Sequence, residues 1–566
     1  MKRAVLLLLA CLFIALNSLP GWAQDTQSTS STSLAGYIRS PRLGITNISY
    51  PETPSSDDRY DKALSLGAGW NRWPLYWDRV ETSPGQFDWS QYDRLVGDDE
   101  AHGLNINAIL LGSPAFFRDG ARISGLQEPI FSDRTDTPRA DKTINPKNPW
   151  ANFVYQAVTR YKPGGTLAGE SASTGGEGVR VWEIWNEPDY TPFWSASILD
   201  YARLLKTAYL VIKMVDPEAQ VMFGGLLFSG GDNWLARVLA IYQDDPFHEQ
   251  YNWYMDSVAI HSYGYPWRSG WLVLNIEQTL KAYELKRPVW MTESGADVWD
   301  DYPGPTWETN PAHRLLRVTE EQQAYFFIQS TAYAWAQGAD VVFFHQLFDD
   351  CGNQPAGTDF PPDDGASCKS GELCSGDAFG LYRNERGSVC FSQHPDPGTA
   401  RPAAAAYQLM ADIFGKGELE NPSIQVLNNK ATVISFDRPD TQQRLFVIWN
   451  MTLDTITLNL PLAEKIAVSY SLDEQKWLTP DADGNFALAL PAATCDYYPF
   501  LQPGEITAIG GKPIIVVSHL SGQPAQPTLV KPDSSKPVSK RPNCKLPQIT
   551  ATPTPATDLL IPGGVG

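Results

Sequence analysis

Two glutamates occupy matching places in the chain, each at the end of an apolar, strand-like run and directly before a turn signal. Glu187 lies in the run V-W-E-I-W-N-E-P, which covers Val181 to Pro188. Glu293 lies in V-W-M-T-E-S-G, which covers Val289 to Gly295. Hydrolysis of an acetal with retained configuration requires one carboxylate as nucleophile and one carboxylic acid that protonates the leaving oxygen, about 5 Å apart. Glu187 and Glu293 are therefore the predicted catalytic pair of a hydrolase.

Two carboxyl groups at such a separation resist being ionised together, because their negative charges repel each other. One of them should hold its proton to higher pH and serve as the acid. Once the other is glycosylated and uncharged, the first can release its proton and act as a base toward water. One pair thus performs both half-reactions. Glu183 shares a strand face with Glu187 and is predicted to be a buried structural acid.

Short apolar runs that are typical of strands alternate with segments of helical periodicity, of which Glu320–Ala336 is the clearest. The predicted strands are Leu43–Ser49, Ala68–Leu75, Ile106–Leu111, Val181–Pro188, Val221–Leu226, Ser257–Ser262, Val289–Thr292 and Val341–Phe344. Such strands form a parallel sheet covered by helices. Eight repeats predict closure into a (β/α)8 TIM barrel, whose catalytic groups lie at the carboxyl ends of the strands. Both glutamates occupy such ends, on the fourth and seventh strands.

The pattern changes after Arg401–Phe414, which is predicted to be the last barrel helix. Beyond it the hydrophobic period is two, which predicts a small antiparallel β-sandwich. From Ser521 onward Pro, Ser, Thr and Lys dominate, as is typical of an extended linker. The predicted organisation is a signal peptide at 1–23, a catalytic barrel with a short N-terminal lead-in at 24–418, a β-sandwich accessory domain at 419–520, and a tail or linker at 521–566.

Composition limits the class of protein. The chain has 566 residues, 43% hydrophobic and 19% charged, with a formal net charge of −20. This describes a globular protein whose acidic surface argues against nucleic acid or an anionic membrane as partner. Lys2 and Arg3 precede an apolar segment, Val5–Leu16, and a small-residue cleavage site, which together indicate export. No later run predicts a membrane span, so we expect a secreted or extracytoplasmic protein with a neutral substrate.

Cysteine usage agrees with export. The six cysteines beyond the signal peptide are Cys351, Cys368, Cys374, Cys390, Cys495 and Cys544. An even number in an exported chain predicts disulfides, and the first four fall in one loop rich in Gly, Pro and Asp. Those four allow three pairings, among which the sequence does not choose. A zinc site is the alternative, although the spacings include no tight C-x-x-C pair.

The residues around the two glutamates resemble the retaining glycoside hydrolases of clan A. The resemblance rests on W-N-E-P at Trp185–Pro188 and T-E-S at Thr292–Ser294, and it covers the chain from about Leu43 to Phe414. With its trailing β-sandwich the chain is most similar to family 39, with families 5 and 51 as near rivals. The resemblance implies that Glu187 is the general acid/base and Glu293 the nucleophile.

The same resemblance implies roles for neighbouring residues. Asn186 would contact the substrate 2-hydroxyl, and Arg72 would steady the charge of the nucleophile. His261 and Tyr263 match the H-x-Y run after strand six, in which the tyrosine hydrogen-bonds the nucleophile. A regular strand would send Asn186 and Glu187 to opposite faces, so the strand end must bulge or twist for both side chains to enter one site.

Residues near other strand ends are candidates for sugar contacts. Many members of the clan carry a tryptophan after strand eight, where this chain has F-F-H-Q-L-F-D-D. His345, Gln346 or Phe348 is expected to take that place. Aromatic faces stack on sugar rings as well as filling cores. The candidate sugar-contacting tryptophans are Trp73, Trp77, Trp194, Trp267 and Trp299.

The sequence thus predicts a secreted retaining β-glycoside hydrolase that acts on poly- or oligosaccharides and requires no cofactor and no metal. One alternative is a transglycosidase, which shares every catalytic residue. The other is a non-catalytic carbohydrate-binding protein on the same scaffold. The sequence does not determine the sugar, the linkage or the oligomeric state.

Overall fold

The computed structural model describes residues 40–51, 56–170, 176–306, 317–352, 367–368, 371, 373–388, 394–494, 509–522 and 526–530. These residues all belong to one compact unit. The predicted signal peptide, residues 531–566 of the predicted tail, and Cys390, Cys495 and Cys544 lie outside the described residues.

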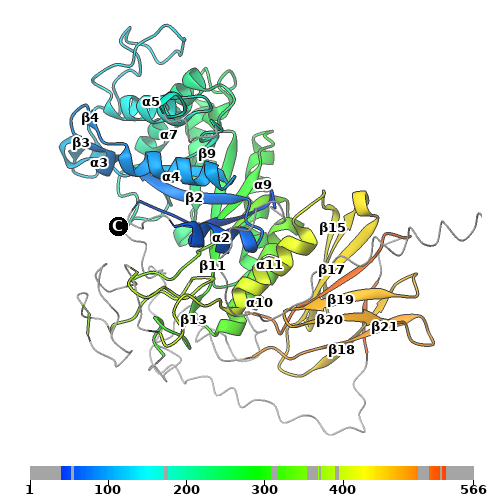
Figure 1. Ribbon diagram of the computed structural model, residues 1–566. Helices are drawn as coiled ribbons and strands as arrows, with labels where there is room; N and C mark the ends of the chain where they lie inside the picture. Colours follow the sequence, from blue (N-terminus) through cyan, green and yellow to red (C-terminus); the bar gives the residue numbers. More distant parts are fainter. Residues whose placement is uncertain are drawn as a thin grey trace, which may run out of the picture. The chain divides into compact units, whose positions relative to one another are not determined.

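Eight parallel strands close into a barrel in the order β1-β14-β11-β10-β9-β8-β5-β2. Figure 1 labels three of them, β2, β9 and β11. The strands are β1 (Leu43–Thr46), β2 (Trp70–Tyr76), β5 (Asn105–Leu111), β8 (Val181–Ile184), β9 (Gln220–Leu226), β10 (Ser257–Tyr263), β11 (Val289–Gly295) and β14 (Ala339–Phe344). The predicted TIM barrel is confirmed, with each predicted strand in its expected place.

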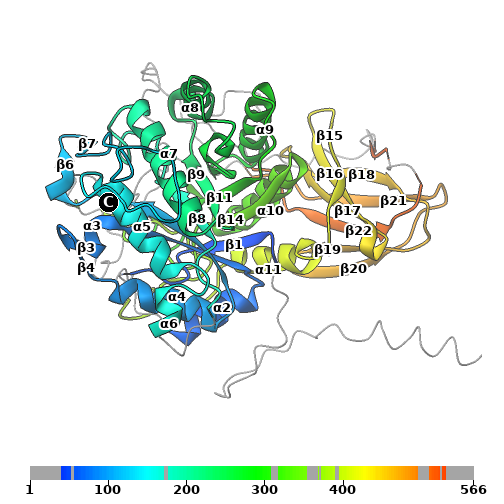
Figure 2. The same cartoon turned by 90° about the horizontal axis from the view of Figure 1, so that it is seen from above.

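Each barrel strand is followed by a helix of the outer layer (Figure 2). These helices are α2 (Asp57–Ser65), α4 (Ser90–Ala101), α5 (Pro149–Tyr161), α7 (Ile198–Val215), α8 (Trp234–Gln243), α9 (Pro266–Ala282), α10 (Glu320–Ala336) and α11 (Pro402–Phe414). Strand and helix alternate in this way because a parallel strand must be reached by a crossover connection.

Side-chain caps fix the points at which two of these helices begin. At the start of α7, Ser197 accepts from the backbone N–H of Asp200, whose carboxylate accepts from the N–H of Ser197. Thr319 and Gln322 form the same reciprocal pair before α10. Each pair satisfies two N–H groups that a helix leaves free at its first turn. Local sequence therefore determines where both helices start.

The barrel interior changes character along the strands. Its amino-terminal half is filled by an apolar cluster of Val181, Met222, Ala259, Trp290, Val341 and Phe343. Val181 begins β8, and Glu183 lies two residues later on the same face of the strand. The interior thus becomes charged toward the carboxyl ends, where Glu183 meets Arg72 of β2.

A β module of two antiparallel sheets follows α11. Its strands are β15 (Glu420–Leu427), β16 (Ala431–Arg438), β17 (Gln443–Asn450), β18 (Ile456–Pro461), β19 (Ala467–Ser471), β20 (Glu474–Leu478), β21 (Asn485–Leu490), β22 (Ile514–His519) and β23 (Thr528–Leu529). The sheet orders are β15-β16-β17-β22-β19-β20 and β21-β18-β23. Strand β23 lies inside the segment predicted to be tail, so the module extends beyond residue 520. The composition of this segment predicts a linker and not a strand, because β23 is short and depends on pairing with β18.

Helix α10 contacts the β module directly. Gln329 donates from Nε2 to the carbonyl oxygen of Gly510 at 3.1 Å and accepts from the N–H of Gly510 at 3.0 Å. The ring centroids of Tyr333 and Trp449 lie 5.3 Å apart. These contacts join the β module to the outer helix layer of the barrel.

Cys368 and Cys374 form a disulfide, and Cys351 is also disulfide-bonded. Bridges therefore restrain the loop region in which the sequence predicts them. Among the helices of the described residues, none is both long and apolar enough to cross a membrane.

Candidate active site

The segment after β8 brings two side chains into the barrel mouth. The strand ends at Ile184, and the backbone then takes left-handed conformations at Trp185 (φ 68°) and Glu187 (φ 44°). Non-glycine residues rarely adopt this region, and it interrupts the alternation of a strand. Asn186 and Glu187 therefore both contact residues of the barrel interior, Arg72 and His261 respectively. This is the twist that the sequence requires if both residues serve one site.

Glu293 lies on β11 and is held by two donors. Arg72 donates from Nη1 to Oε1 at 2.7 Å, and the hydroxyl of Tyr263 donates to Oε2. Its side chain is 12% exposed, so an approach from the barrel mouth remains open. Burial by itself would raise the pKa of Glu293, but His261 and Arg72 together outweigh it and hold this pKa well below its usual value. Glu293 is thus an ionised carboxylate at neutral pH.

Glu187 keeps its proton to a higher pH than an ordinary glutamate does. Its side chain is 7% exposed, and this burial raises the pKa of Glu187 to about 7. The contact with His261 works against the rise, while the nearby charge of Glu293 adds to it. Two titratable groups whose surroundings push their pKa values apart are the usual basis for separate acid and base roles.

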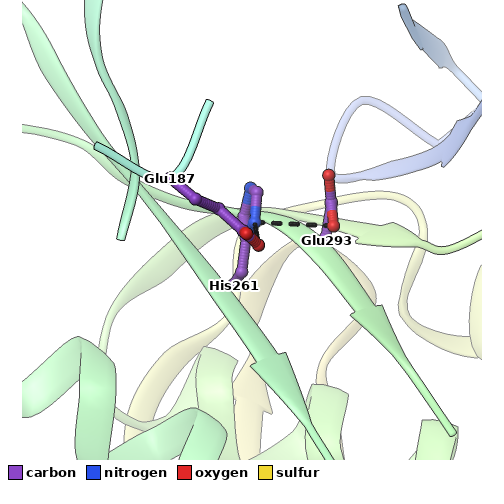
Figure 3. Close-up of side chains that lie close together, drawn as sticks. All are labelled: Glu187, His261 and Glu293. Atoms are coloured by element: carbon purple, nitrogen blue, oxygen red, sulfur yellow. Dashed lines mark hydrogen bonds and ion pairs between the residues drawn. The ribbon is translucent and has the colours of Figure 1, made fainter. Parts of the chain in front are cut away.

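His261 lies between the two glutamates, and Figure 3 shows the three side chains turned toward one another. Its Nδ1 is 2.7 Å from Glu187 Oε1 and 3.4 Å from Glu293 Oε2. Its Nε2 is 3.3 Å from a guanidinium nitrogen of Arg72. Burial lowers the pKa of His261, but Glu293 and Glu187 outweigh it and raise this pKa above its ordinary value, so the ring readily becomes a cation. In the neutral ring Nε2 accepts, because a guanidinium only donates, and in both states Nδ1 carries a proton toward Glu187. One oxygen of Glu187 then accepts from His261, which leaves the other to hold a transferable proton.

Arg72 is fixed by a second carboxylate below the site. Glu183 binds it in bidentate fashion, with Nε–Oε2 at 2.8 Å and Nη2–Oε1 at 2.9 Å. Asn107 and the backbone N–H of Gly225 also donate to Glu183. Arg72 in turn donates to Oδ1 of Asn186 at 3.0 Å. The amide N–H groups of Asn186 donate to no group of the described residues, so they can donate to a ligand. Glu183 is thus a buried structural acid, as expected, and it orients the guanidinium of Arg72.

The two residues after β14 lie at the rim of this cluster. The His345 ring packs edge-on against Tyr263, with centroids 5.9 Å apart, and Nδ1 is 3.0 Å from Thr46 Oγ1. Gln346 accepts from Asn47 at 2.9 Å and donates to Asp350 at 3.3 Å. The structure therefore places His345 beside Tyr263, which donates to Glu293, and places Gln346 between Asn47 and Asp350.

Trp73 and Trp77 lie elsewhere, and their predicted role in sugar contact is wrong for this geometry. Both side chains are fully buried, and their indole N–H groups donate to Asp99 at 2.8 Å and Glu81 at 2.5 Å. Trp73 follows Arg72 on β2, and because Arg72 points into the barrel, Trp73 must face the surrounding helices. These rings fill the space between strands and helices.

The other tryptophan candidates differ in exposure, and the sugar contacts predicted for Trp267 and Trp299 stay predictions. Trp194 is buried edge-on against Trp185, with ring centroids 5.0 Å apart. Trp267 is 48% exposed on α9. Sequence reasoning instead missed Thr46, Asn47 and Asp350, which reach the rim from the segments after β1 and β14. The rule that places catalytic groups at strand ends could have found them, since no local motif marks them.

Three residues of this cluster offer possible ligand atoms for a metal ion. Within the described residues, Glu187, His261 and Glu293 each offer one ligand atom, and these atoms lie within 4.8 Å of one another. However, Arg72 and Tyr263 already donate to Glu293, and the guanidinium would repel a cation. The arrangement suits a protonated carboxyl beside an ionised one better than a metal centre.

The site therefore consists of two buried carboxyl groups, one just beyond the end of the fourth strand and one on the seventh strand of an eight-stranded parallel barrel. No family model matches the chain. A segment of 157 residues is 29% identical to a beta-xylosidase of Geobacillus stearothermophilus. This segment makes up 27% of this chain and 27% of the relative. The similarity therefore spans about a quarter of that relative's length.

Solved structures with a similar course of the chain include several glycoside hydrolases. A family 30 subfamily 8 xylanase from Clostridium acetobutylicum has a TM-score of 0.47 at 13% identity, covering 86% of this chain and 98% of its own. A family 51 alpha-L-arabinofuranosidase from Bifidobacterium longum has a TM-score of 0.47 at 12% identity, covering 85% and 97%.

Proposed function

We propose that the protein is a secreted retaining β-glycoside hydrolase in which Glu293 is the nucleophile and Glu187 the general acid/base. One observation carries the proposal: carboxylate oxygens of the two residues lie within 4.8 Å of each other, in surroundings that raise the pKa of Glu187 and lower the pKa of Glu293. Retaining enzymes place their carboxyls about 5 Å apart, whereas inverting enzymes need about 6.5 Å or more to admit a water.

The first half-reaction breaks the glycosidic bond. Glu293 attacks the anomeric carbon while Glu187 gives its proton to the leaving oxygen, so a glycosyl ester replaces the C–O bond and a free alcohol departs. Tyr263 and Arg72 hold the Glu293 carboxylate in position before attack. The ester carries no charge, so the pKa of Glu187 falls once the nucleophile is occupied.

The second half-reaction uses the same groups in reverse. Glu187, now ionised, takes a proton from water, and the resulting nucleophile attacks the anomeric carbon. The ester bond to Glu293 breaks and the carboxylate is restored. Two inversions at one carbon leave the configuration of the sugar unchanged.

Two further observations support the finer points of the proposal. Similarity to a beta-xylosidase makes β-xylosides the first substrates to test. The disulfide between Cys368 and Cys374 fits an oxidising compartment, as expected for an exported protein. Membership of family 39 stays a proposal on the resemblance of the W-N-E-P and H-x-Y segments.

The test is hydrolysis of aryl β-glycosides (xyloside, glucoside, mannoside, galactoside and arabinoside) by the mature protein and by Glu293→Ala. We expect turnover of one sugar, its loss in the variant, and rescue by azide that yields the glycosyl azide of inverted configuration. That product arises only if a small anion enters the space of the missing nucleophile.

Glu249→Ala is the matched control, because this exposed glutamate precedes β10 and so lies toward the opposite end of the barrel. Its activity should equal that of the parent. Polysaccharides that bind but remain uncut, together with no turnover of any aryl glycoside, would favour the non-catalytic binding protein over the hydrolase.

A further inference from the structure

A pocket lies among the outer elements of the barrel, and none of the residues that line it belongs to the candidate active site. Its volume is about 620 Å³, which falls in the range of small-molecule sites. Three segments supply its walls: the loop after β5 (residues 127–137), one face of α7, and the connection 245–254 between α8 and β10. On α7 the lining residues are three and four positions apart, so they lie on one side of the helix.

Positively charged side chains outnumber negatively charged ones among the residues that line this pocket. Arg203 of α7 pairs with Asp136, with Nη1 2.5 Å from Oδ2, and Lys206 pairs with Asp245. Arg134 is exposed, and its side chain has neither an ion pair nor a hydrogen bond within the part of the chain that the structure describes. The pocket thus carries one unpaired positive charge on a protein whose formal net charge is −20.

Aromatic rings form the rest of the wall. Phe247 is 50% exposed, and its ring centroid lies 6.4 Å from that of Tyr251. The ring centroid of Tyr251 in turn lies 6.2 Å from that of Tyr254, with 28° between the ring planes. Tyr254 is buried and donates its hydroxyl to Asp245 at 2.9 Å, which holds that carboxylate in the pocket wall. An exposed ring beside fixed polar groups can pack against the apolar face of a sugar.

We propose that this pocket is an accessory binding site for an acidic glycan, meaning a hydroxyl-rich sugar chain that carries an occasional carboxylate. Arg134 binds the carboxylate, Asp136 and Asp245 accept sugar hydroxyls, and Phe247 packs against a ring. A dense polyanion fits poorly, because the two carboxylates in the wall and the net charge of the protein repel it. The proposal does not depend on the proposed hydrolysis, since the catalytic glutamates are not part of the pocket.

The experiment is electrophoresis of the full chain carrying Glu187→Gln, so that the polymer stays intact, in native gels containing glucuronic-acid-substituted xylan. A parallel gel contains the carboxyl-reduced form of the same polymer. We expect retardation in the acidic gel and much less in the reduced one. Adding Arg134→Ala should weaken binding of the acidic polymer about tenfold, the usual effect of one charge-assisted contact.

Two further variants make the test specific. Phe247→Ala should weaken binding to both polymers, because the ring contact does not depend on charge. Arg139→Ala is the matched control, since this exposed arginine pairs with Asp141 and lies outside the pocket, and it should bind like the parent. Equal thermal melting of all variants excludes misfolding as the cause.

The proposal is overturned if Arg134→Ala binds like the parent, if carboxyl reduction has no effect, or if inorganic polyphosphate competes as well as the glycan, which would indicate a general anion site. Hydrolysis of aryl glycosides by the otherwise unmodified protein and by Arg134→Ala reports on the proposed function alone. Failure of catalysis and failure of glycan binding are therefore separate results.

Discussion

Glu187 and Glu293 are the same residue type in opposite surroundings. Glu293 receives donors from Arg72 and Tyr263, whereas Glu187 faces His261 in a buried position. Burial prevails at Glu187 and raises its pKa to about 7, while at Glu293 the neighbouring cations outweigh burial. In the proposed mechanism, the neighbours of each carboxyl are therefore what distinguishes the acid from the nucleophile.

This difference predicts the pH dependence of kcat/KM. Glu187 must be protonated to act, so activity should fall as pH rises through about 7. Glu293 must be ionised, so the acidic limb should lie well below the ordinary range of a glutamate. Glu187→Gln should abolish the alkaline limb on an activated aryl glycoside, whose leaving group needs no proton. A profile whose alkaline limb survives in that variant would assign the pKa to another group.

Tyr263→Phe removes one of the two donors that hold Glu293. The lost hydrogen bond stabilises the ionised carboxylate, so the pKa of Glu293 should rise and the acidic limb of the profile should move to higher pH. A hydrogen bond to a charged group contributes roughly 1.5–3 kcal/mol, so kcat should fall about tenfold or more. Tyr155→Phe on α5 is the control. A fall in kcat without a shifted limb would mean that the hydroxyl acts elsewhere.

At the scale of elements, β9 must pass very close to the catalytic cluster. Gly225 near its end donates to Glu183 at 3.0 Å, and a Cβ added there would overlap the imidazole of His261. Gly224 likewise approaches the backbone of Trp185. Two adjacent glycines thus let β9 lie against both the turn after β8 and the histidine that orients Glu187.

Gly225→Ala should therefore displace His261 without unfolding the barrel. Misplacement of a catalytic group by about 1 Å can cost roughly a hundredfold in rate, so we expect a loss of that order in kcat/KM with a near-native circular dichroism spectrum. Gly169→Ala in the short helix α6 (Thr166–Glu170) meets no atom within 4 Å and should leave activity unchanged. Equal activity of both variants would show that His261 tolerates the shift.

At the scale of the whole molecule, the β module and the barrel share buried hydrogen bonds. The amide of Gln329 on α10 both donates to and accepts from the backbone of Gly510. The side chain is 1% exposed, so water cannot replace either bond easily. The module is thus joined to the helix that follows β11, the strand that carries Glu293.

Gln329→Ala should lower the free energy of unfolding by about 2–4 kcal/mol, because it leaves two buried backbone groups without a partner. Calorimetry would show this as a lower Tm. Gln243→Ala at the exposed end of α8 should leave the Tm unchanged. Should Gln329→Ala melt like the parent, the module would contribute little to the stability of the barrel through this contact.

Prediction from sequence was most successful for the elements. The eight strands and the positions of Glu187 and Glu293 at two strand ends follow from local periodicity, which depends on residues that are neighbours in the chain. The same rule failed for Trp73, because being aromatic and near a strand end does not say which face a side chain takes. Strand β23 was missed because two residues form a strand only when a partner such as β18 lies alongside.

The sequence by itself determined the barrel, the place of the two glutamates and the resemblance to a family of hydrolases, since each is written in short stretches of the chain. Only the tertiary structure decided which glutamate is ionised. Arg72 and Glu293 are 221 residues apart in sequence, and His261 and Glu187 are 74 apart. Contacts over such separations exist only after the barrel closes, and burial, which raises the pKa of Glu187, is a property of the folded chain.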